Sequence, residues 1–286
     1  MVKFRNQSDG LSTNLEDRRT MRSPGGLAAG GGIIGVVIVV VIALLGGGGG
    51  NGAPDLNDIF NQIQTGSGGS SGTVDPADEP LVKEMSAALD DIQGFWASGD
   101  GLGSDYQDAK LVLFTGSVAT GGCGTAPSAV GPFYCPGDSK AYIDLSFFRE
   151  LRDKYGAPGD FAQVYVLAHE LGHHVQNLQG ISAEVSQKQQ ANPSKANELS
   201  VRLELQADCY AGVWGHSAQD RGLLEPGDID EGLDAAAAVG DDALGNGNRE
   251  SWTHGSSASR QKWFKAGFAN GDLNDCDTFS VPTRAL

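Results

Sequence analysis

Three residues in the segment "VYVLAHELGHHVQNLQG" have the types and spacing of a metal site. His169 and His173 are four residues apart, so on a helix both imidazoles can reach one ion from the same side. Glu170 is rotated by about 100° from His169, which directs its carboxylate toward a water on the ion and away from the ion itself. A solvated helix face or a hydrogen-bonded core histidine is the alternative for a single histidine. The complete H-E-x-x-H pattern favours a zinc site.

A catalytic zinc site needs a third protein ligand and one position left for water. The segment "ELQAD" supplies Glu204, and Asp208 lies four residues later on the same helix face. We expect Glu204 to bind zinc and Asp208 to orient one of the histidines. The alternative is an acidic pair on a solvent-exposed face. Repulsion between like charges at this spacing mildly disfavours that alternative.

The chemistry expected from these residues is hydrolysis of a peptide bond without a covalent intermediate. Zinc would lower the pKa of a bound water toward about 7 and polarise the peptide carbonyl. Glu170 would accept a proton from the attacking water and pass it to the leaving amine. His254, in the loop segment "WTHGSS", is a candidate donor to the developing oxyanion. A purely structural role is the alternative for His254.

A function of another class is a membrane-anchored binding or scaffold protein with a structural or vestigial zinc site. A structural zinc site is normally closed by a fourth protein ligand, often cysteine or histidine. Cys209 adjoins Asp208 but lies one helical step from the face of Glu204, so we do not expect it to bind zinc. A metal hydrolase for substrates other than peptides also fits the motif.

Two helices must carry the candidate site. Apolar residues recur at helical spacing from Val164 and predict a helix through residues 164–179 with one face in the core. Asp160 is its expected N-terminal cap and Gly180 its expected stop. A longer helix, residues 194–217, carries both acidic residues.

The remaining elements predict an α+β fold that is mainly helical, with a small sheet. The segments "KLVLFTGSV" and "KAYIDLSFF" have strand character. Further helices are expected in "PLVKEMSAALDDIQGFWASG", "GDIDEGLDAAAAVGDDALG" and "SSASRQKWFKAGFANGD".

The chain has 286 residues and a net charge of −16. Because no Lys and Arg cluster is present, we expect no nucleic-acid surface. Its length without the ends is typical of one folded domain of roughly 200 residues. We interpret the negative net charge as an acidic, solvent-exposed surface of a soluble domain. Nothing in the composition predicts the oligomeric state.

The charge distribution predicts a single-pass membrane protein. Residues 1–24 carry five basic and three acidic residues, and no charge occurs from Ser23 to Pro54. We expect a cytoplasmic basic tail at 1–24, a transmembrane helix at 25–46, a flexible Gly/Ser linker at 47–79 and the catalytic domain at 80–286. The positive-inside rule then places the catalytic domain outside the cytoplasm.

Two alternatives compete with this anchor. The strongly apolar core, Ile33 to Leu45, is only 13 residues long, and a short core after a basic segment is also typical of a cleavable signal peptide. The lack of an A-x-A-like site directly after Leu45 favours the anchor. Arg18 and Arg19 resemble a twin-arginine signal, but the apolar core does not follow them closely.

The four cysteines suggest two disulfides if the domain is extracytoplasmic. Three pairings are possible, and four free thiols are the alternative. Cys123 and Cys135 flank a Gly- and Pro-rich loop, which favours a local bridge. That bridge leaves Cys209 to pair with Cys276, so we predict these two bonds.

Several motifs together resemble one family. They are "HELGHH", "RLELQADCYAGVWG", "THGSSASRQKWFKAGF" and "CDTF", behind a basic tail and a single apolar segment. The chain is similar to the bacterial putative neutral zinc metallopeptidase family from its N-terminus to about Phe279, least so in the linker. The resemblance implies a zincin-like domain with zinc at His169, His173 and Glu204 and with Glu170 catalytic. It does not imply a substrate beyond a peptide or protein.

A further expectation comes from analogy with other zincins. Tyr142 and Asp144, on the predicted strand before the active-site helix, would line a groove in which a substrate strand adds to the sheet.

Overall fold

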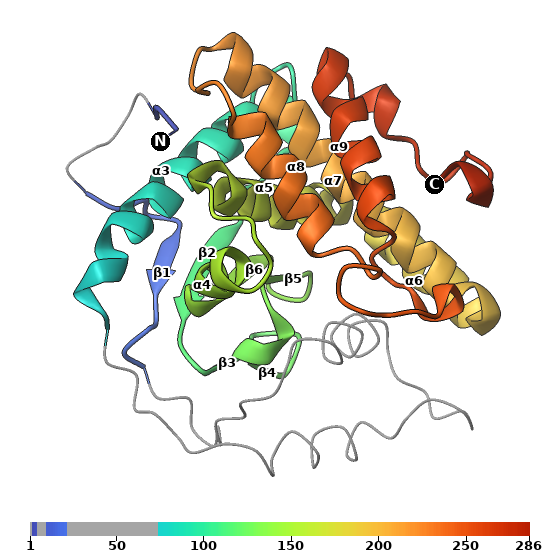
Figure 1. Cartoon of the computed structure of the whole chain (residues 1–286), viewed down its shortest axis with the longest axis horizontal. Helices are drawn as coiled ribbons and strands as arrows, with labels where there is room; N and C mark the ends of the chain where they lie inside the picture. The colour runs from blue at the N-terminus through green and yellow to red at the C-terminus, as the bar shows by residue number, and fades with distance from the viewer. Residues whose placement is uncertain (1, 5–9, 22–73) are drawn as a thin grey trace.

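A computed structural model describes residues 2–4, 10–21 and 74–286 (Figure 1). Their fold is α+β and mainly helical, as predicted. The helices are α3 (Glu79–Trp96), α4 (Ser146–Asp153), α5 (Asp160–Leu178), α6 (Ile181–Ala191), α7 (Ala196–Asp220), α8 (Asp228–Ala238) and α9 (Ser257–Asn270).

The sheet is small and mixed. Its strands are β1 (Leu15–Asp17), β2 (Lys110–Phe114), β6 (Lys140–Asp144) and β5 (Phe133–Cys135), in that order across the sheet. The first three are parallel, and β5 is antiparallel to β6. A separate hairpin joins β3 (Ser117–Ala119) to β4 (Thr125–Pro127).

Helix α5 runs through the centre of the molecule, between the sheet and the helices that follow it (Figure 1). It contacts β5 and β6 as well as α3, α7 and α8. The predicted apolar stripe of this helix is confirmed, because Val164, Leu167, Leu171 and Val175 are completely buried. Because this stripe is buried in the core, the orientation of α5 about its own axis is fixed, and so are the directions of its remaining side chains.

The segment that was predicted to be a cytoplasmic tail contributes to this fold. Residues 15–17 form β1, the outer strand of the sheet, and residues 10–21 lie against β2 and α3. The fold of the described residues thus extends beyond the predicted domain at 80–286. The predicted transmembrane helix at 25–46 lies outside the described residues. Within the described ranges, no helix is long and apolar enough to cross a membrane.

Three local predictions are corrected. Tyr142 and Asp144 lie on β6, which has β2 on one side and β5 on the other, so they cannot line an edge groove. Asp144 instead accepts hydrogen bonds from the Gly116 and Ser146 amides. Asp160 is the first residue of α5 and not its cap, which is Gly159.

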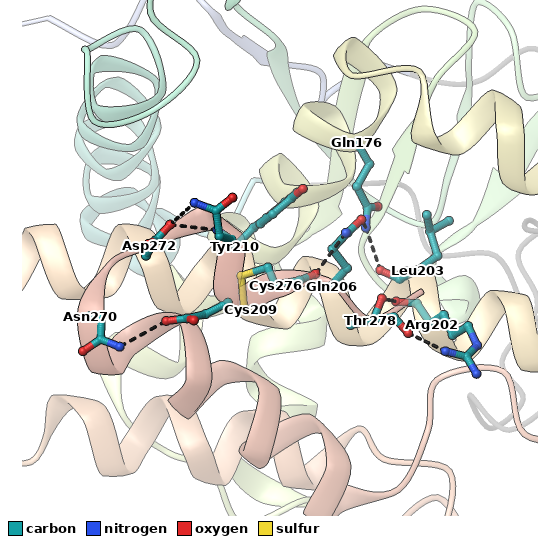
Figure 2. Close-up of a disulfide and its surroundings, with 12 residues drawn as sticks. Gln176, Arg202, Leu203, Gln206, Cys209, Tyr210, Asn270, Asp272, Cys276 and Thr278 are labelled. Atoms are coloured by element: carbon teal, nitrogen blue, oxygen red, sulfur yellow. Dashed lines mark hydrogen bonds between the residues drawn. A yellow bond between two sulfur atoms is a disulfide. The ribbon is translucent and has the colours of Figure 1, made fainter. Parts of the chain in front are cut away.

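Both predicted disulfides are confirmed. Cys123 pairs with Cys135, which fastens the hairpin region to β5, and Cys209 pairs with Cys276, which fastens the C-terminal segment to α7 (Figure 2).

Candidate metal centre

The two helices that carry the candidate site approach each other at a glycine. A Cβ atom on Gly172 of α5 would lie 3.0 Å from the Ala207 carbonyl oxygen of α7 and 3.1 Å from its Cα. Gly172 stands between Glu170 and His173 in the sequence, and Ala207 stands directly before Asp208. The close approach therefore sets the acidic face of α7 against the histidines of α5.

The three predicted ligands converge. His169 Nε2 lies 3.2 Å from Glu204 Oε2, and His173 Nε2 lies 3.4 Å from Glu204 Oε1. One ligand atom from each residue can be chosen so that all lie within 4.8 Å of one another. Two imidazole nitrogens and one carboxylate form a donor set that zinc accepts in catalytic sites. These residues therefore fit a zinc ion.

His169 is oriented by a buried charged network. Its Nδ1 donates to Asp208 Oδ1 at 2.8 Å, and Asp208 is fully buried. Arg260 of α9 donates to both oxygens of Asp208, with Nε and Nη2 each at 2.8 Å. The Tyr165 hydroxyl donates to Asp208 Oδ1 at 2.5 Å. With Nδ1 held by Asp208, the Nε2 atom of His169 is the one free to bind a metal.

A close helix contact brings Arg260 to this network. A Cβ on Gly267 of α9 would lie 2.0 Å from the Cys209 carbonyl oxygen of α7, and one on Gly212 would lie 2.1 Å from the Phe264 carbonyl oxygen. Only glycine permits the two helices to lie this close. Arg260 is two turns before Gly267 on α9, and it reaches Asp208, the residue before Cys209.

The charges in the network shift the pKa values of its members. Burial alone would lower the pKa of His169, but the carboxylates of Asp208 and Glu204 raise it to about 9. Burial alone would raise the pKa of Glu204, but the charges of His173 and His169 hold it well below its usual range. Burial also opposes ionisation of Asp208, whose pKa Arg260 and His169 lower. The two carboxylates thus favour the protonated form of His169, and the histidines favour the ionised form of Glu204.

The second histidine is oriented from the opposite side. His173 Nδ1 donates to Gln176 Oε1 at 2.9 Å. Gln176 in turn donates to the Leu203 carbonyl at 2.7 Å and to Gln206 Oε1 at 3.1 Å (Figure 2). Gln206 donates to the carbonyl of Cys276 at 3.0 Å. A chain of amides thus connects His173 to the disulfide-bonded C-terminal segment.

Glu170 lies beside the ligands without joining them. Among the described residues its carboxylate has no hydrogen-bond partner, although it is buried. Burial raises its pKa, and the charges of His169 and His173 oppose the rise. A carboxylate with a raised pKa and no competing partner suits proton transfer near neutral pH.

A pocket opens over these residues. Its polar lining includes the three ligand residues together with Glu170, His254 and Arg260. The lining also includes apolar residues, namely Val130, Phe133, Phe147, Val166, Val239 and Leu244. Such a lining can receive an apolar side chain of a bound peptide.

His254 reaches the pocket from a loop that one aspartate holds. Asp241 Oδ2 accepts hydrogen bonds from three consecutive backbone amides, those of Thr253, His254 and Gly255, at 2.8–2.9 Å. Its Oδ1 lies 3.3 Å from His254 Nδ1. The loop is therefore fixed with the histidine at the pocket wall, and the oxyanion role of His254 stays a prediction.

Other candidates from the sequence lie outside the centre. Cys209 is bonded to Cys276 and cannot close a zinc site. His174 Nε2 donates to the Gln107 carbonyl at 2.6 Å, and its Nδ1 accepts from the Tyr134 hydroxyl at 2.8 Å. Burial lowers the pKa of His174, so it is a neutral core residue that joins α5 to β5.

Sequence reasoning missed Arg260, Gln176 and Asp241. Arg260 and Asp241 act through contacts between separate segments of the chain, which no spacing relative to the H-E-x-x-H motif reveals. Gln176 follows His173 by three residues on α5, so its helical spacing was a signal that could have identified it. The one available signal for Arg260 was "SSASRQKWFKAGF", which the family resemblance included as a motif without assigning a role to its arginine.

Comparisons with known proteins agree with this geometry. The "Putative neutral zinc metallopeptidase" family model matches residues 2–279. The chain is 49% identical over 217 residues to "Uncharacterized protein YpfJ" of Escherichia coli (strain K12), covering 73% of this chain and 75% of that protein. It is 50% identical over 192 residues to "Uncharacterized protein Rv2575" of Mycobacterium tuberculosis (strain ATCC 25618 / H37Rv), covering 62% and 64%. No solved structure matches the chain.

Proposed function

Because the chain belongs to the putative neutral zinc metallopeptidase family, we propose that it hydrolyses peptide bonds with zinc held by His169, His173 and Glu204. The observation that carries the proposal is the convergence of these ligand atoms within 4.8 Å beside the unpartnered carboxylate of Glu170. The domain is accordingly a zincin-like one, with the third ligand supplied by a glutamate.

Each residue of the site has a separate role in the proposed hydrolysis. When bound, zinc supplies Lewis acidity and lowers the pKa of a water toward about 7. Glu170 takes a proton from the attacking water and delivers it to the leaving amine. His254 donates to the oxyanion. Asp208 holds the tautomer of His169, and the apolar lining of the pocket positions the peptide.

We also propose that the enzyme works outside the cytoplasm. Two disulfides support this location, since such bonds persist in oxidising compartments. The substrate is a peptide or protein.

Two glutamine variants of the full-length protein separate the roles of the acidic residues. Wild-type protein should contain one zinc per chain. Glu170→Gln should keep that zinc and its melting temperature but lose peptidase activity by at least about a hundredfold, because the amide cannot accept the proton. Glu204→Gln should lose zinc affinity together with activity. Glu150→Gln, which changes an exposed carboxylate, is the matched control.

Two outcomes would overturn parts of the proposal. Near-normal hydrolysis by Glu170→Gln would remove Glu170 as the base. A zinc-loaded wild-type protein that cleaves nothing in a broad peptide library would favour a binding or scaffold protein.

A further inference from the structure

The N-terminal arm, residues 10–21, belongs to the sheet although a long uncharged stretch separates it from the rest of the domain in the sequence. Its strand β1 pairs in parallel with β2, with Leu15 opposite Leu111. The Leu111 amide donates to the Asn14 carbonyl at 2.9 Å, and the Arg18 amide donates to the Leu113 carbonyl at 2.8 Å. The arm is thus held by backbone pairing in a defined register.

Side chains fasten the arm to α3 as well. Arg19 is only 4% exposed and donates to Asp17 Oδ2 at 2.7 Å and to Glu79 Oε1 at 2.8 Å. The Ser12 amide donates to Ser86 Oγ at 2.7 Å. Asp17 belongs to the arm itself, so the bond to Glu79 is the one that ties Arg19 to α3, and the Glu79 side chain is 50% exposed.

The arm covers one edge of the sheet. Leu111, Val112 and Leu113 of β2 are completely buried, and β1 covers the edge that β2 would otherwise present. An uncovered apolar edge strand is a site for pairing with other chains. Residues 74–286 alone would expose that edge.

This arrangement constrains the membrane topology. Paired strands lie about 4.8 Å apart, whereas the hydrocarbon core of a bilayer is about 30 Å thick. A single crossing between residues 21 and 74 would place β1 and β2 on opposite faces of the membrane, where they cannot pair. We infer that the N-terminal arm and the catalytic domain lie in the same compartment.

The sequence of the intervening stretch is compatible with this inference. Its strongly apolar core, Ile33 to Leu45, has 13 residues and reaches the roughly 20 of a spanning helix only together with the flanking Gly and Ala from Gly25. The inference replaces the expected cytoplasmic tail with an arm that shares the location of the active site. It does not depend on the peptidase reaction.

Site-specific labelling in intact cells tests the inference on the full chain. One variant carries Met21→Cys in the arm, where the side chain is 64% exposed, and the other carries Lys265→Cys on the exposed side of α9. A membrane-impermeant maleimide is added before and after detergent lysis. Both cysteines should react before lysis, or both only after it. If Lys265→Cys reacts in intact cells and Met21→Cys only after lysis, the inference is wrong.

A second measurement tests whether the arm is docked. Arg19→Met in the full-length protein should lower the melting temperature by about 2–4 °C, because it removes a guanidinium side chain that is 3% exposed together with its bonds to the partly exposed carboxylates of Asp17 and Glu79. Arg149→Met, which removes an ion pair to Asp78 from a side chain that is 48% exposed, should change it by about 1 °C or less. Equal, small changes in both variants would show that the arm is not part of the folded domain.

Discussion

Arg260 is the residue whose contribution the structure reveals most directly. It is buried, spans both oxygens of Asp208 and so holds the partner of His169. We predict that Arg260→Met weakens zinc binding about 10- to 100-fold, the usual range for residues that orient a ligand. Arg260→Lys should recover only part of the affinity, because lysine keeps the charge but lacks the bidentate fork.

Competition with a chelator of known affinity measures this effect apart from any direct contact of Arg260 with substrate. Arg152→Met is the control, since Arg152 forms an exposed pair with Asp153 on α4. An unchanged zinc affinity in a folded Arg260→Met protein would contradict the prediction.

The convergence of the candidate ligands could be predicted at this scale, whereas the residues that support them could not. His169, His173, Glu204 and Asp208 lie at i, i+4 spacings within single helices, where the helical period alone fixes which side chains share a face. Arg260 meets Asp208 only because α9 packs on α7 at Gly267. A contact between residues 52 positions apart has no periodic signature in one sequence.

At the scale of elements, the start of α5 meets α3 and α8 through several carboxylates. Glu84 of α3 is affected most: burial, assisted by the charge of Asp160, raises its pKa to about 7. Its Oε1 atom is buried and has no hydrogen-bond partner among the described residues. Between its unfolded pKa of 4.5 and this value, the folded state holds the extra proton, so Glu84 destabilises the fold progressively as pH rises through that window.

We therefore predict a pH-dependent gain for Glu84→Gln. The melting temperature of the variant relative to wild type should be higher at pH 8 than at pH 5, because glutamine does not ionise. Thermal unfolding at both pH values measures it, with Glu150→Gln as an exposed control. If the melting temperatures of Glu84→Gln and wild type differ by the same amount at pH 5 and pH 8, Glu84 does not titrate in this way.

Long elements with one apolar face could be predicted, whereas short ones could not. The stripes of α3, α5 and α7 extend over several turns and give a clear period. Strands β1 and β5 have three residues each, too few to show alternation, and β1 lies among charged residues. The order of strands was also beyond the sequence, so the interior position of Tyr142 and Asp144 could not be foreseen.

At the scale of the whole molecule, the two disulfides should differ in effect. The Cys209–Cys276 bond closes 67 residues and the Cys123–Cys135 bond 12. The chain-entropy model gives about 4 kcal/mol of stability for the longer loop and about 3 kcal/mol for the shorter one. Replacing each pair by serines should therefore destabilise both proteins, the longer loop more.

Zinc affinity should distinguish the two variants more sharply. The Cys276 carbonyl anchors Gln206, which anchors Gln176, the partner of His173. Loss of the long disulfide should weaken zinc binding about tenfold, and loss of the short one should not. Denaturant unfolding and chelator competition on both double-serine proteins make the comparison. Equal zinc affinities in the two variants would mean that the hydrogen bonds from Cys276 through Gln206 and Gln176 do not affect the position of His173.

The pairing of β1 with β2 also has a consequence in time. Leu113 follows Asp17 by 96 residues, so a ribosome adding about 5–20 residues per second takes about 5–20 s to make the partner of β1. During that interval the uncharged stretch after the arm is synthesised, and the strand that receives the arm has not yet been made. Factors that bind the nascent chain during these seconds therefore determine the compartment of the arm before β2 is made. The stability of the finished fold cannot act on that choice, because the partner strand does not yet exist.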